Sequence, residues 1–236
     1  MTAITAQTLG VRFMFDRQQR VITPLLGRLR RHGSVTWGIR DLCFRIGPGE
    51  GVALLGRSGS GKTTLLRALA GVYVPDDGRL DVGGRVASLL SIDAGLAPSL
   101  TGRENAQLLC VLASASASAA TLDEVKKRTG LGDAYERPVS SFSQGMRARL
   151  GFAVAEQIVP DVLLLDEVHE ALDHEYRAVV ERCAVHVRAN GGIVVAAGHD
   201  HDLLERMCGR AMVLEGGGII FDGTFAHART AYLGSL

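Results

Sequence analysis

The sequence predicts an α/β fold in which a largely parallel β-sheet is flanked by helices. Short apolar segments alternate with helical stretches along most of the chain, which is the pattern of such folds. Residues 162–165 and Ile193–Ala197 are apolar at every position, as expected for strands that are covered on both faces. A glycine-rich stretch, 56–61, separates the predicted strand Gly51–Leu55 from the predicted helix 63–70.

Residues 91–157 look mostly helical, so we predict one domain in which a helical subdomain is inserted into the α/β core. The core then comprises about residues 1–90 and 158–236. Thr121 followed three residues later by Glu124 is typical of a capping box, which predicts that a helix starts there.

Two further patterns complete the predicted elements. Residues 211–214 and 219–221 flank three consecutive glycines, which predicts a late antiparallel hairpin. Residues 113–120 consist of Ala and Ser, and we interpret them as a connection or the end of a solvated helix.

The composition is that of a globular protein. Of 236 residues, 47% are hydrophobic and 22% charged, and the net charge of +1 argues against a general nucleic-acid binder. No run approaches the ~20 apolar residues that span a bilayer, and the first ten residues show no secretory pattern, so we expect a cytosolic location. The cysteines have no metal-ligand spacing and are predicted to be reduced core residues: Cys43, Cys110, Cys183 and Cys208.

The stretch from Arg12 to Arg31 contains six arginines and one acid, Asp16. Leu25, Leu26 and Leu29 could form the apolar side of a short helix in it. Two interpretations stay open: a solvated basic face, or a contact with anionic head groups or a phosphate-bearing substrate.

Residues 56–63 fit the phosphate-binding pattern G-x-x-x-x-G-K-[ST] completely, between a predicted strand and a predicted helix. Gly59 and Gly61 let the backbone turn its N–H groups inward around phosphate oxygens. Lys62 is expected to neutralise the β and γ phosphates of a nucleotide, and the Thr63 hydroxyl to ligate Mg²⁺. The predicted nucleotide-binding residues here are Gly56, Arg57, Ser58, Gly59, Ser60, Gly61, Lys62, Thr63 and Thr64.

Polar residues follow two of the predicted strands. Asp166 could hold Mg²⁺, and Glu167 could orient and deprotonate an attacking water, although two acids at a strand end can also start a helix. His199 could be an ordinary polar contact or reach the γ-phosphate. Because α/β sheets bind ligands at the carboxyl ends of their strands, we favour the second role.

With these motifs in place, the chain resembles the nucleotide-binding subunit of ABC transporters over nearly its full length. Residues 142–146 (FSQGM) stand in the place of the signature motif, residues 170–173 resemble the D-loop, and His199 resembles the switch histidine. The resemblance assigns the signature to Ser143, Gln144, Gly145 and Met146, and the D-loop carboxylate to Asp173.

The variant signature at 143–153 and the stretches 84–86 and 100–105 resemble exporters of O-antigen, capsular polysaccharide and teichoic acid. The resemblance implies an ATPase subunit that powers transport of a lipid-linked polysaccharide or polyol-phosphate polymer, with ATP and Mg²⁺ as cofactors. The implied partners are a second copy of the chain, two copies of a membrane permease and, through the permease, the lipid-linked glycan. The implied location is peripheral, on the cytoplasmic face of the inner membrane.

In the family's arrangement, Ser143 would cap the following helix and, with the backbone of Gly145, meet the γ-phosphate bound by the opposite subunit. Gln144 replaces a glycine of the common motif. The stretch that aligns with the Q-loop, 91–95, lacks the usual glutamine.

An aromatic residue upstream of the phosphate motif is expected to stack on adenine. Trp37 is the choice by spacing, Phe13 and Phe15 are weaker candidates, and core packing is the alternative role for each of them.

Two other functions stay open. A soluble ABC ATPase of DNA repair or translation would usually carry long coiled-coil insertions or tandem cassettes, which 236 residues do not accommodate. A transporter ATPase for an unrelated cargo, such as a drug or lipid, is disfavoured by the variant signature.

Overall fold

The computed structural model describes residues 2–15, 34–89, 95–113, 115–158, 160–166 and 174–234. Several predicted features lie outside these residues: most of the basic stretch, residues 91–94 of the stretch that resembles the Q-loop, Glu167, and the D-loop-like segment with Asp173. The roles predicted for them stay predictions, as do the domain boundaries.

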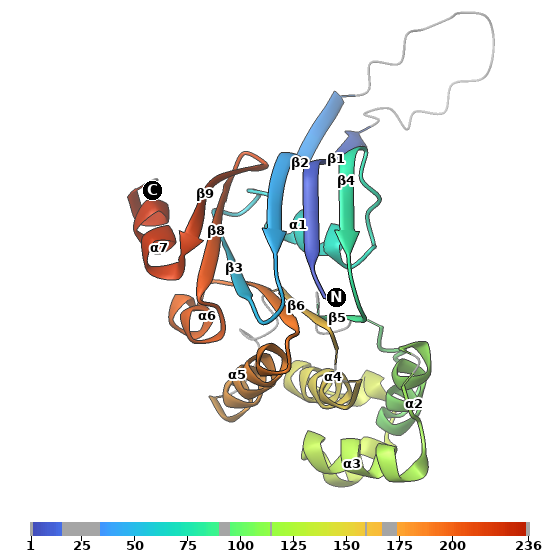
Figure 1. Ribbon diagram of the computed structural model, residues 1–236. Coiled ribbons are helices and arrows are strands. Elements are labelled where there is room, and N and C mark those ends of the chain that lie inside the picture. Colours follow the sequence, from blue (N-terminus) through green and yellow to red (C-terminus); the bar gives the residue numbers. More distant parts are fainter. Residues whose placement is uncertain are drawn as a thin grey trace, which may run out of the picture.

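The central sheet contains six strands, namely β3 (Gly51–Leu55), β5 (Val86–Leu89), β6 (Val162–Asp166), β7 (Ile193–Ala197), β8 (Arg210–Glu215) and β9 (Gly218–Thr224). Their spatial order is β5-β6-β7-β3-β8-β9. Figure 1 shows β8 and β9 at the edge next to α7, and β5 toward the opposite edge. All neighbouring pairs are parallel except β8 and β9, which form an antiparallel hairpin. The predicted α/β fold and the late hairpin are therefore confirmed.

A second, antiparallel sheet has three strands in the order β2-β1-β4: β1 (Ile4–Phe15), β2 (Ser34–Ile46) and β4 (Asp77–Val82). The pairing of β1 with β2 is irregular, with several register shifts. Thr8 and Asp41 have φ angles of 47° and 53°, a region that is uncommon outside glycine. Antiparallel elements were predicted, but the sequence analysis did not assign these particular strands.

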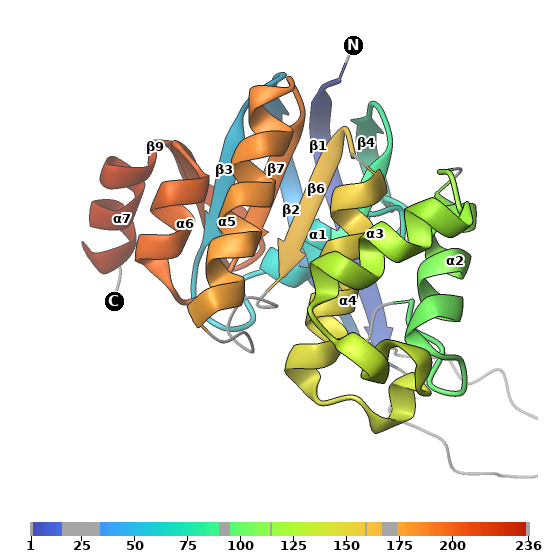
Figure 2. The same ribbon diagram turned by 90° about the horizontal axis from the view of Figure 1, so that it is seen from below.

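Helices cover both faces of the central sheet. Successive side chains of a strand point to opposite faces, so Val52 and Leu54 of β3 pack on one side, while Ala53 and Leu55 pack on the other. The first side faces α1 (Lys62–Leu69) and the antiparallel sheet. The second faces helices that lie side by side in Figure 2, namely α5 (His174–Ala189), α6 (His201–Met207) and α7 (Phe225–Gly234).

The remaining helices form a separate lobe with its own apolar cluster, here called the helical lobe. It contains α2 (Gly102–Leu112), α3 (Ala119–Thr129), the short 3₁₀ turns η1 (Gly132–Glu136) and η2 (Val139–Ser141), and α4 (Gln144–Ile158). The longest of these, α4, contributes buried side chains to both the helical lobe and the core (for example Leu150 and Phe152, respectively).

Two helix starts differ from the sequence prediction. The capping box predicted at Thr121 is wrong, because α3 begins at Ala119 and the Ser118 hydroxyl accepts the N–H of Thr121 at 3.2 Å. A complete capping box occurs instead at the start of α2, between Thr101 and Glu104.

The exposure of one cysteine also differs from the prediction. Cys110, Cys183 and Cys208 are buried free thiols, whereas Cys43 is exposed on β2. Its sulfur accepts the backbone N–H of Thr8 at 3.2 Å, next to the irregular β1–β2 pairing.

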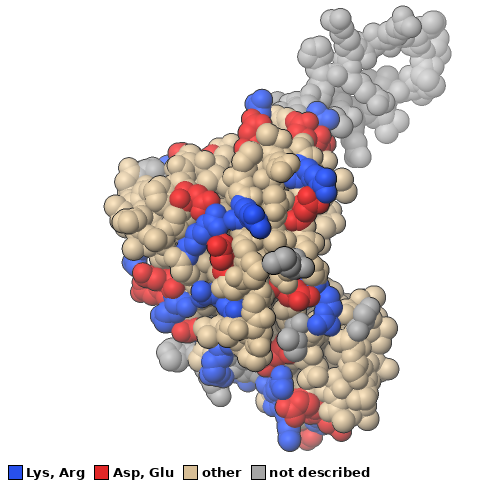
Figure 3. Space-filling model, in the orientation of Figure 1, with Lys and Arg blue, Asp and Glu red and all other residues tan. Residues whose placement is uncertain are grey.

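On the face seen in Figure 3, acidic and basic side chains are interspersed, in keeping with the net charge of +1. No helix in the described part of the chain has the length and apolar character needed to cross a bilayer.

Candidate nucleotide-binding site

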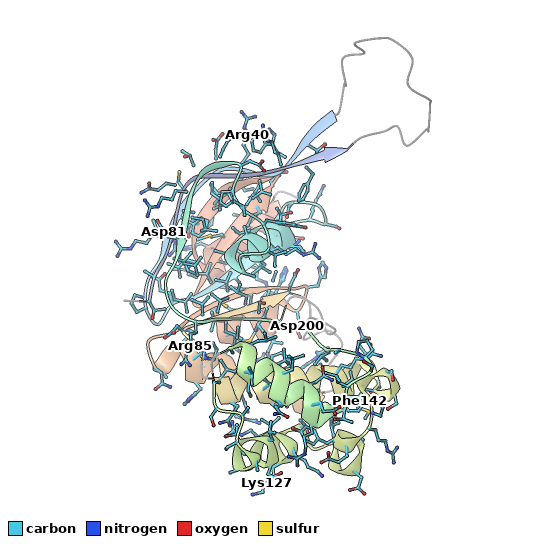
Figure 4. The ribbon with its side chains drawn as sticks, turned by 90° about the vertical axis from the view of Figure 1, so that its right-hand side faces the viewer. Arg40, Asp81, Arg85, Lys127, Phe142 and Asp200 are labelled. Carbon is cyan, nitrogen blue, oxygen red and sulfur yellow. The ribbon has the colours of Figure 1, made fainter. Side chains whose placement is uncertain are left out.

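Three segments with chemically important residues follow neighbouring parallel strands. The phosphate loop (residues 56–63) follows β3, Asp166 ends β6, and His199 lies two residues beyond β7. β7 lies between β6 and β3, and its Ala197 pairs with Asp166 on one side and with Leu54 on the other. Because parallel strands end at one edge, the sheet brings the three segments together, as predicted. Asp200, which follows His199, is labelled at this edge in Figure 4.

The phosphate loop is shaped by glycines. Gly59 and Gly61 have φ angles of 80° and 110°, which L side chains rarely adopt. A Cβ atom on Gly61 would lie 2.6 Å from the carbonyl oxygen of Gly38 and 2.8 Å from the Ile39 side chain. The loop therefore lies directly against β2, and a side chain at Gly61 would force the two apart.

Lys62 is the first residue of α1, and it is only 7% exposed. Its Nζ atom donates hydrogen bonds to the carbonyl oxygens of Gly56 at 2.7 Å and Arg57 at 3.0 Å, which hold the amine over the loop. The first N–H groups of a helix have no acceptor within that helix, so those of Thr63 and Thr64 are available to an anion. The amine and the helix start together suit a phosphate chain.

Ser60 gives a second indication of a ligand. Its hydroxyl is buried and has no hydrogen-bond partner among the described residues. Buried polar atoms are nearly always hydrogen-bonded in folded proteins. A phosphate oxygen or a water molecule would satisfy this hydroxyl.

The turn between β8 and β9 is hydrogen-bonded to the phosphate loop. The N–H of Gly217 donates to the carbonyl of Ser60 at 3.2 Å, and the Gly217 carbonyl accepts the N–H of Arg40 at 2.8 Å. One glycine thus links the loop to the antiparallel sheet. The sequence predicted a hairpin turn at the three glycines but gave no signal for this contact, which depends on the tertiary fold.

The residues predicted to bind Mg²⁺ supply suitable atoms. Asp166 is 7% exposed at the end of β6, and Thr63 lies in the first turn of α1, which packs on β6 and β7 in the core. A carboxylate and a hydroxyl are hard oxygen donors of the kind that Mg²⁺ takes together with phosphate oxygens. The donor set therefore fits the ion.

The segment that carries His199 is held in place by the next residue, Asp200. The His199 side chain is exposed just beyond the end of β7. The next residue, Asp200, caps α6 by accepting the N–H of Leu203 at 3.0 Å, and it also accepts a hydrogen bond from Arg177 at 3.2 Å. Asp200 therefore fixes the backbone that presents His199 at the carboxyl edge.

The signature-like residues lie in the helical lobe. The Ser143 hydroxyl accepts the N–H of Met146 at 3.2 Å, so Ser143 caps α4 as predicted. Ser143 and Gln144 are exposed and Gly145 is half-buried, whereas the preceding Phe142 is buried in the lobe. Figure 4 shows Phe142 in this lobe. The buried ring anchors a surface segment that is free to meet another molecule.

The candidate adenine-stacking residues lie in different surroundings. Trp37 covers Gly10 and lies 5.4 Å beneath the Arg40 guanidinium. A Cβ atom added at Gly38 would touch both the Phe13 ring and the Thr64 side chain of α1. The Phe13 ring also packs against Tyr73, with the ring centroids 5.4 Å apart. Phe13, the weaker candidate by spacing, is therefore the one set beside the phosphate-binding helix. The stacking role of Trp37 stays a prediction.

This combination of a glycine-shaped loop, a lysine at a helix start and a carboxylate at the end of β6, on the far side of β7, defines a P-loop nucleotide-binding protein. The ABC transporter family model matches residues 39–170. The chain belongs to the ABC transporter family, and within it to the ATP-hydrolysing cassettes.

Curated relatives carry more specific names. The O-antigen export system ATP-binding protein RfbE of Yersinia enterocolitica is 36% identical over 81% of this chain and 81% of its own length. RfbB of Klebsiella pneumoniae, another O-antigen export ATP-binding protein, is 35% identical over 75% of this chain and 73% of its own length. The teichoic acids export ATP-binding protein TagH of Listeria monocytogenes is 31% identical over 83% of this chain.

Some relatives are much longer than the matched region. The chain spans 59% of that TagH and 44% of RfbB of Myxococcus xanthus. Among solved structures, the dimeric ATP-binding cassette MJ0796 with ADP and Pi has a TM-score of 0.76 at 19% identity, over 94% of this chain and 98% of that one. This likeness confirms the cassette fold.

Replacing Lys62 by Ala should weaken ATP binding by about ten-fold or more, since hydrogen bonds to charged groups contribute about 1.5–3 kcal/mol. Titration with a fluorescent ATP analogue measures the affinity. Lys127→Ala, which removes an exposed cation from α3, is the matched control and should bind as the unmodified protein does. Equal affinities for all three proteins would contradict the assignment of the phosphate loop.

On the observed geometry, Phe13→Ala should weaken ATP binding more than Trp37→Ala does. Loss of base stacking costs about 1–3 kcal/mol, and it should leave the affinity for inorganic tripolyphosphate unchanged, because that ligand has no base. Calorimetric titration with both ligands separates stacking from general damage to the fold. The reverse order of the two variants would support Trp37, the choice made by spacing.

Proposed function

We propose that the chain is the ATPase subunit of an exporter that moves a lipid-linked polysaccharide or polyol-phosphate polymer across the cytoplasmic membrane. The observation that carries this proposal is the phosphate loop, with Asp166 and His199 at the same sheet edge, on a chain whose relatives are named for O-antigen and teichoic acid export. The variant signature, which the sequence analysis related to the same exporters, agrees with those names.

At the nucleotide edge, the backbone N–H groups of the phosphate loop and the Lys62 amine bind the phosphates of ATP. Thr63 and Asp166 would hold Mg²⁺, directly or through water, and the ion would neutralise charge that develops on the phosphates. Glu167 orients the attacking water and takes its proton, and His199 contacts the γ-phosphate. Preorganised donors at the phosphates supply most of the rate enhancement in this class of reaction.

Two copies of the chain form the complete ATP site. The signature residues of one copy meet the γ-phosphate held by the other, through the Ser143 hydroxyl and the Gly145 backbone. The exposure of Ser143 and Gln144 at the start of α4 supports this role, because the segment is accessible to a partner. Asp173 would lie at the contact between the copies, as the resemblance implies.

The permease docks in a groove between the core and the helical lobe. A cavity of about 320 Å³ is lined by residues 86–88 of β5, Leu109 and Leu112 of α2, and the α4 residues Gly151, Val154 and Ala155, together with Gly95, Ala113 and Ile158. Leu112 is 71% exposed and the neighbouring Val111 59%. Gly95 closes the stretch that aligns with the Q-loop, the family's link to the permease. An apolar groove at this place suits a segment of a membrane protein on the cytoplasmic face.

Glu167→Gln should bind ATP, accumulate as a closed dimer and hydrolyse ATP about 10²–10⁴-fold more slowly, because the water loses its base. Phosphate release measures the rate, and size-exclusion chromatography with Mg·ATP measures the dimer. Adding Ser143→Arg should return the variant to a monomer. Glu124→Gln removes a carboxylate on α3 and is the matched control, with normal turnover expected. Near-normal hydrolysis by Glu167→Gln would exclude it as the base.

Leu112→Glu should keep ATP hydrolysis but abolish export, because a charge in the apolar groove opposes permease docking. Cells of the source organism that lack the gene, complemented with each variant, report export through their surface glycan, and co-purification of the permease reports docking. Val74→Glu places the same charge at an 81% exposed site away from the groove and is the matched control. Normal surface glycan in the cells lacking the gene would contradict the proposed cargo. Normal docking by Leu112→Glu would contradict the groove.

A further inference from the structure

The carboxyl-terminal helix reaches the phosphate loop from the far end of the sequence. A cavity of about 160 Å³ lies between residues 56–60 of the loop, residues 214–216 at the end of β8, and the side chain of Tyr232. Tyr232 is the residue of α7 that lines this cavity. An aromatic residue from outside the nucleotide motifs therefore lies across a small cavity from the segment that wraps the phosphates.

The same tyrosine contacts the segment that carries the switch histidine. The rings of Tyr232 and His201 meet edge to face, with their centroids 5.5 Å apart. His201 is the first residue of α6, two positions after His199. Burial and the nearby Arg229 lower the pKa of His201, which favours the neutral form of the ring.

Helix α7 holds Tyr232 firmly in this place. Phe225 and Ala228 are buried against the core at 2% and 0% exposure. Arg229 forms ion pairs with Asp202 at 3.1 Å and Glu205 at 3.6 Å, both on α6. Buried apolar contacts and ion pairs thus tie α7 to α6, and a shift of one helix would move the other.

We infer that Tyr232 is a positioning residue, which packs against the His199–His201 segment and closes the cavity beside the phosphate loop. One rigid ring with two torsion angles contacts the one segment and walls the cavity beside the other, at a small cost in conformational entropy. It keeps the loop and His199 in the relative positions that phosphate binding and hydrolysis need, and it couples the carboxyl-terminal helix to the ATP site. The inference rests on the proposed role of His199 at the γ-phosphate.

Tyr232→Ala should raise the Kd for Mg·ATP and lower kcat, each by about three- to ten-fold, because small misplacements of reacting groups are costly. Tyr232→Phe keeps the ring and should lose much less of either quantity than Tyr232→Ala does, since packing requires the ring. Leu233→Ala, at the neighbouring 55% exposed position, is the matched control and should change neither quantity. Steady-state hydrolysis, ATP titration and thermal unfolding are measured on the full chain for each variant.

A double-mutant cycle tests the contact itself. His201→Ala should reproduce the loss of kcat, and the double variant Tyr232→Ala/His201→Ala should be no worse than either single variant.

Unchanged Kd and kcat in Tyr232→Ala would overturn the inference. So would a fall in the unfolding midpoint with normal kcat per folded molecule, which indicates a purely structural role, or an equal loss in Tyr232→Phe. Absence of ATP hydrolysis by the unmodified chain would count against the proposed function, while the Kd of Tyr232→Ala would still decide the inference.

Discussion

The nucleotide site depends on the parallel register of β6, β7 and β3. Both faces of β6 are apolar, with residues 162 and 164 on one side and 163 and 165 on the other, so the strand runs through the core. Asp166, the last described residue of this strand, is 7% exposed and places a carboxylate at the end of the apolar run. The pairing of Asp166 with Ala197 determines where His199 lies along the edge of the sheet. The pairing of Ala197 with Leu54 determines where the phosphate loop begins at the same edge.

Much of the core could be predicted because its signals are local. The strands at Gly51–Leu55 and Ile193–Ala197 agree with the prediction to the residue, since each is an apolar run bounded by glycine or polar residues. The long strands β1 and β2 could not be assigned in the same way. Register shifts between them, with positive φ angles at Thr8 and Asp41, break the alternation that marks a half-buried strand.

The residues of the candidate site also fall into those that a local sequence motif predicts and those that only the tertiary fold brings together. The phosphate loop is a local motif, so its glycines and Lys62 could be named from spacing. The hydrogen bond from Gly217 to the loop and the position of Tyr232 beside the loop's cavity both join segments far apart in sequence, so no local sequence pattern predicts them. For Trp37 and Phe13, distance along the chain does not reveal which aromatic ring lies beside α1, because a bulged strand changes which face each side chain takes. The start of α3 was misplaced for a simpler reason, since Ser118 and Thr121 both carry a hydroxyl suited to capping.

Helix α4 joins the parts of the proposed mechanism. Its first turn presents the signature capped by Ser143, while Gly151, Val154 and Ala155 line the groove proposed for the permease. Its buried side chains are shared, with Phe152 in the core and Leu150 in the helical lobe. A 15-residue helix is a rigid rod of about 22 Å, so a permease that displaces its middle must also displace its start. In the proposed mechanism, movement of the groove and closure of the signature on ATP would then be one motion of a single helix.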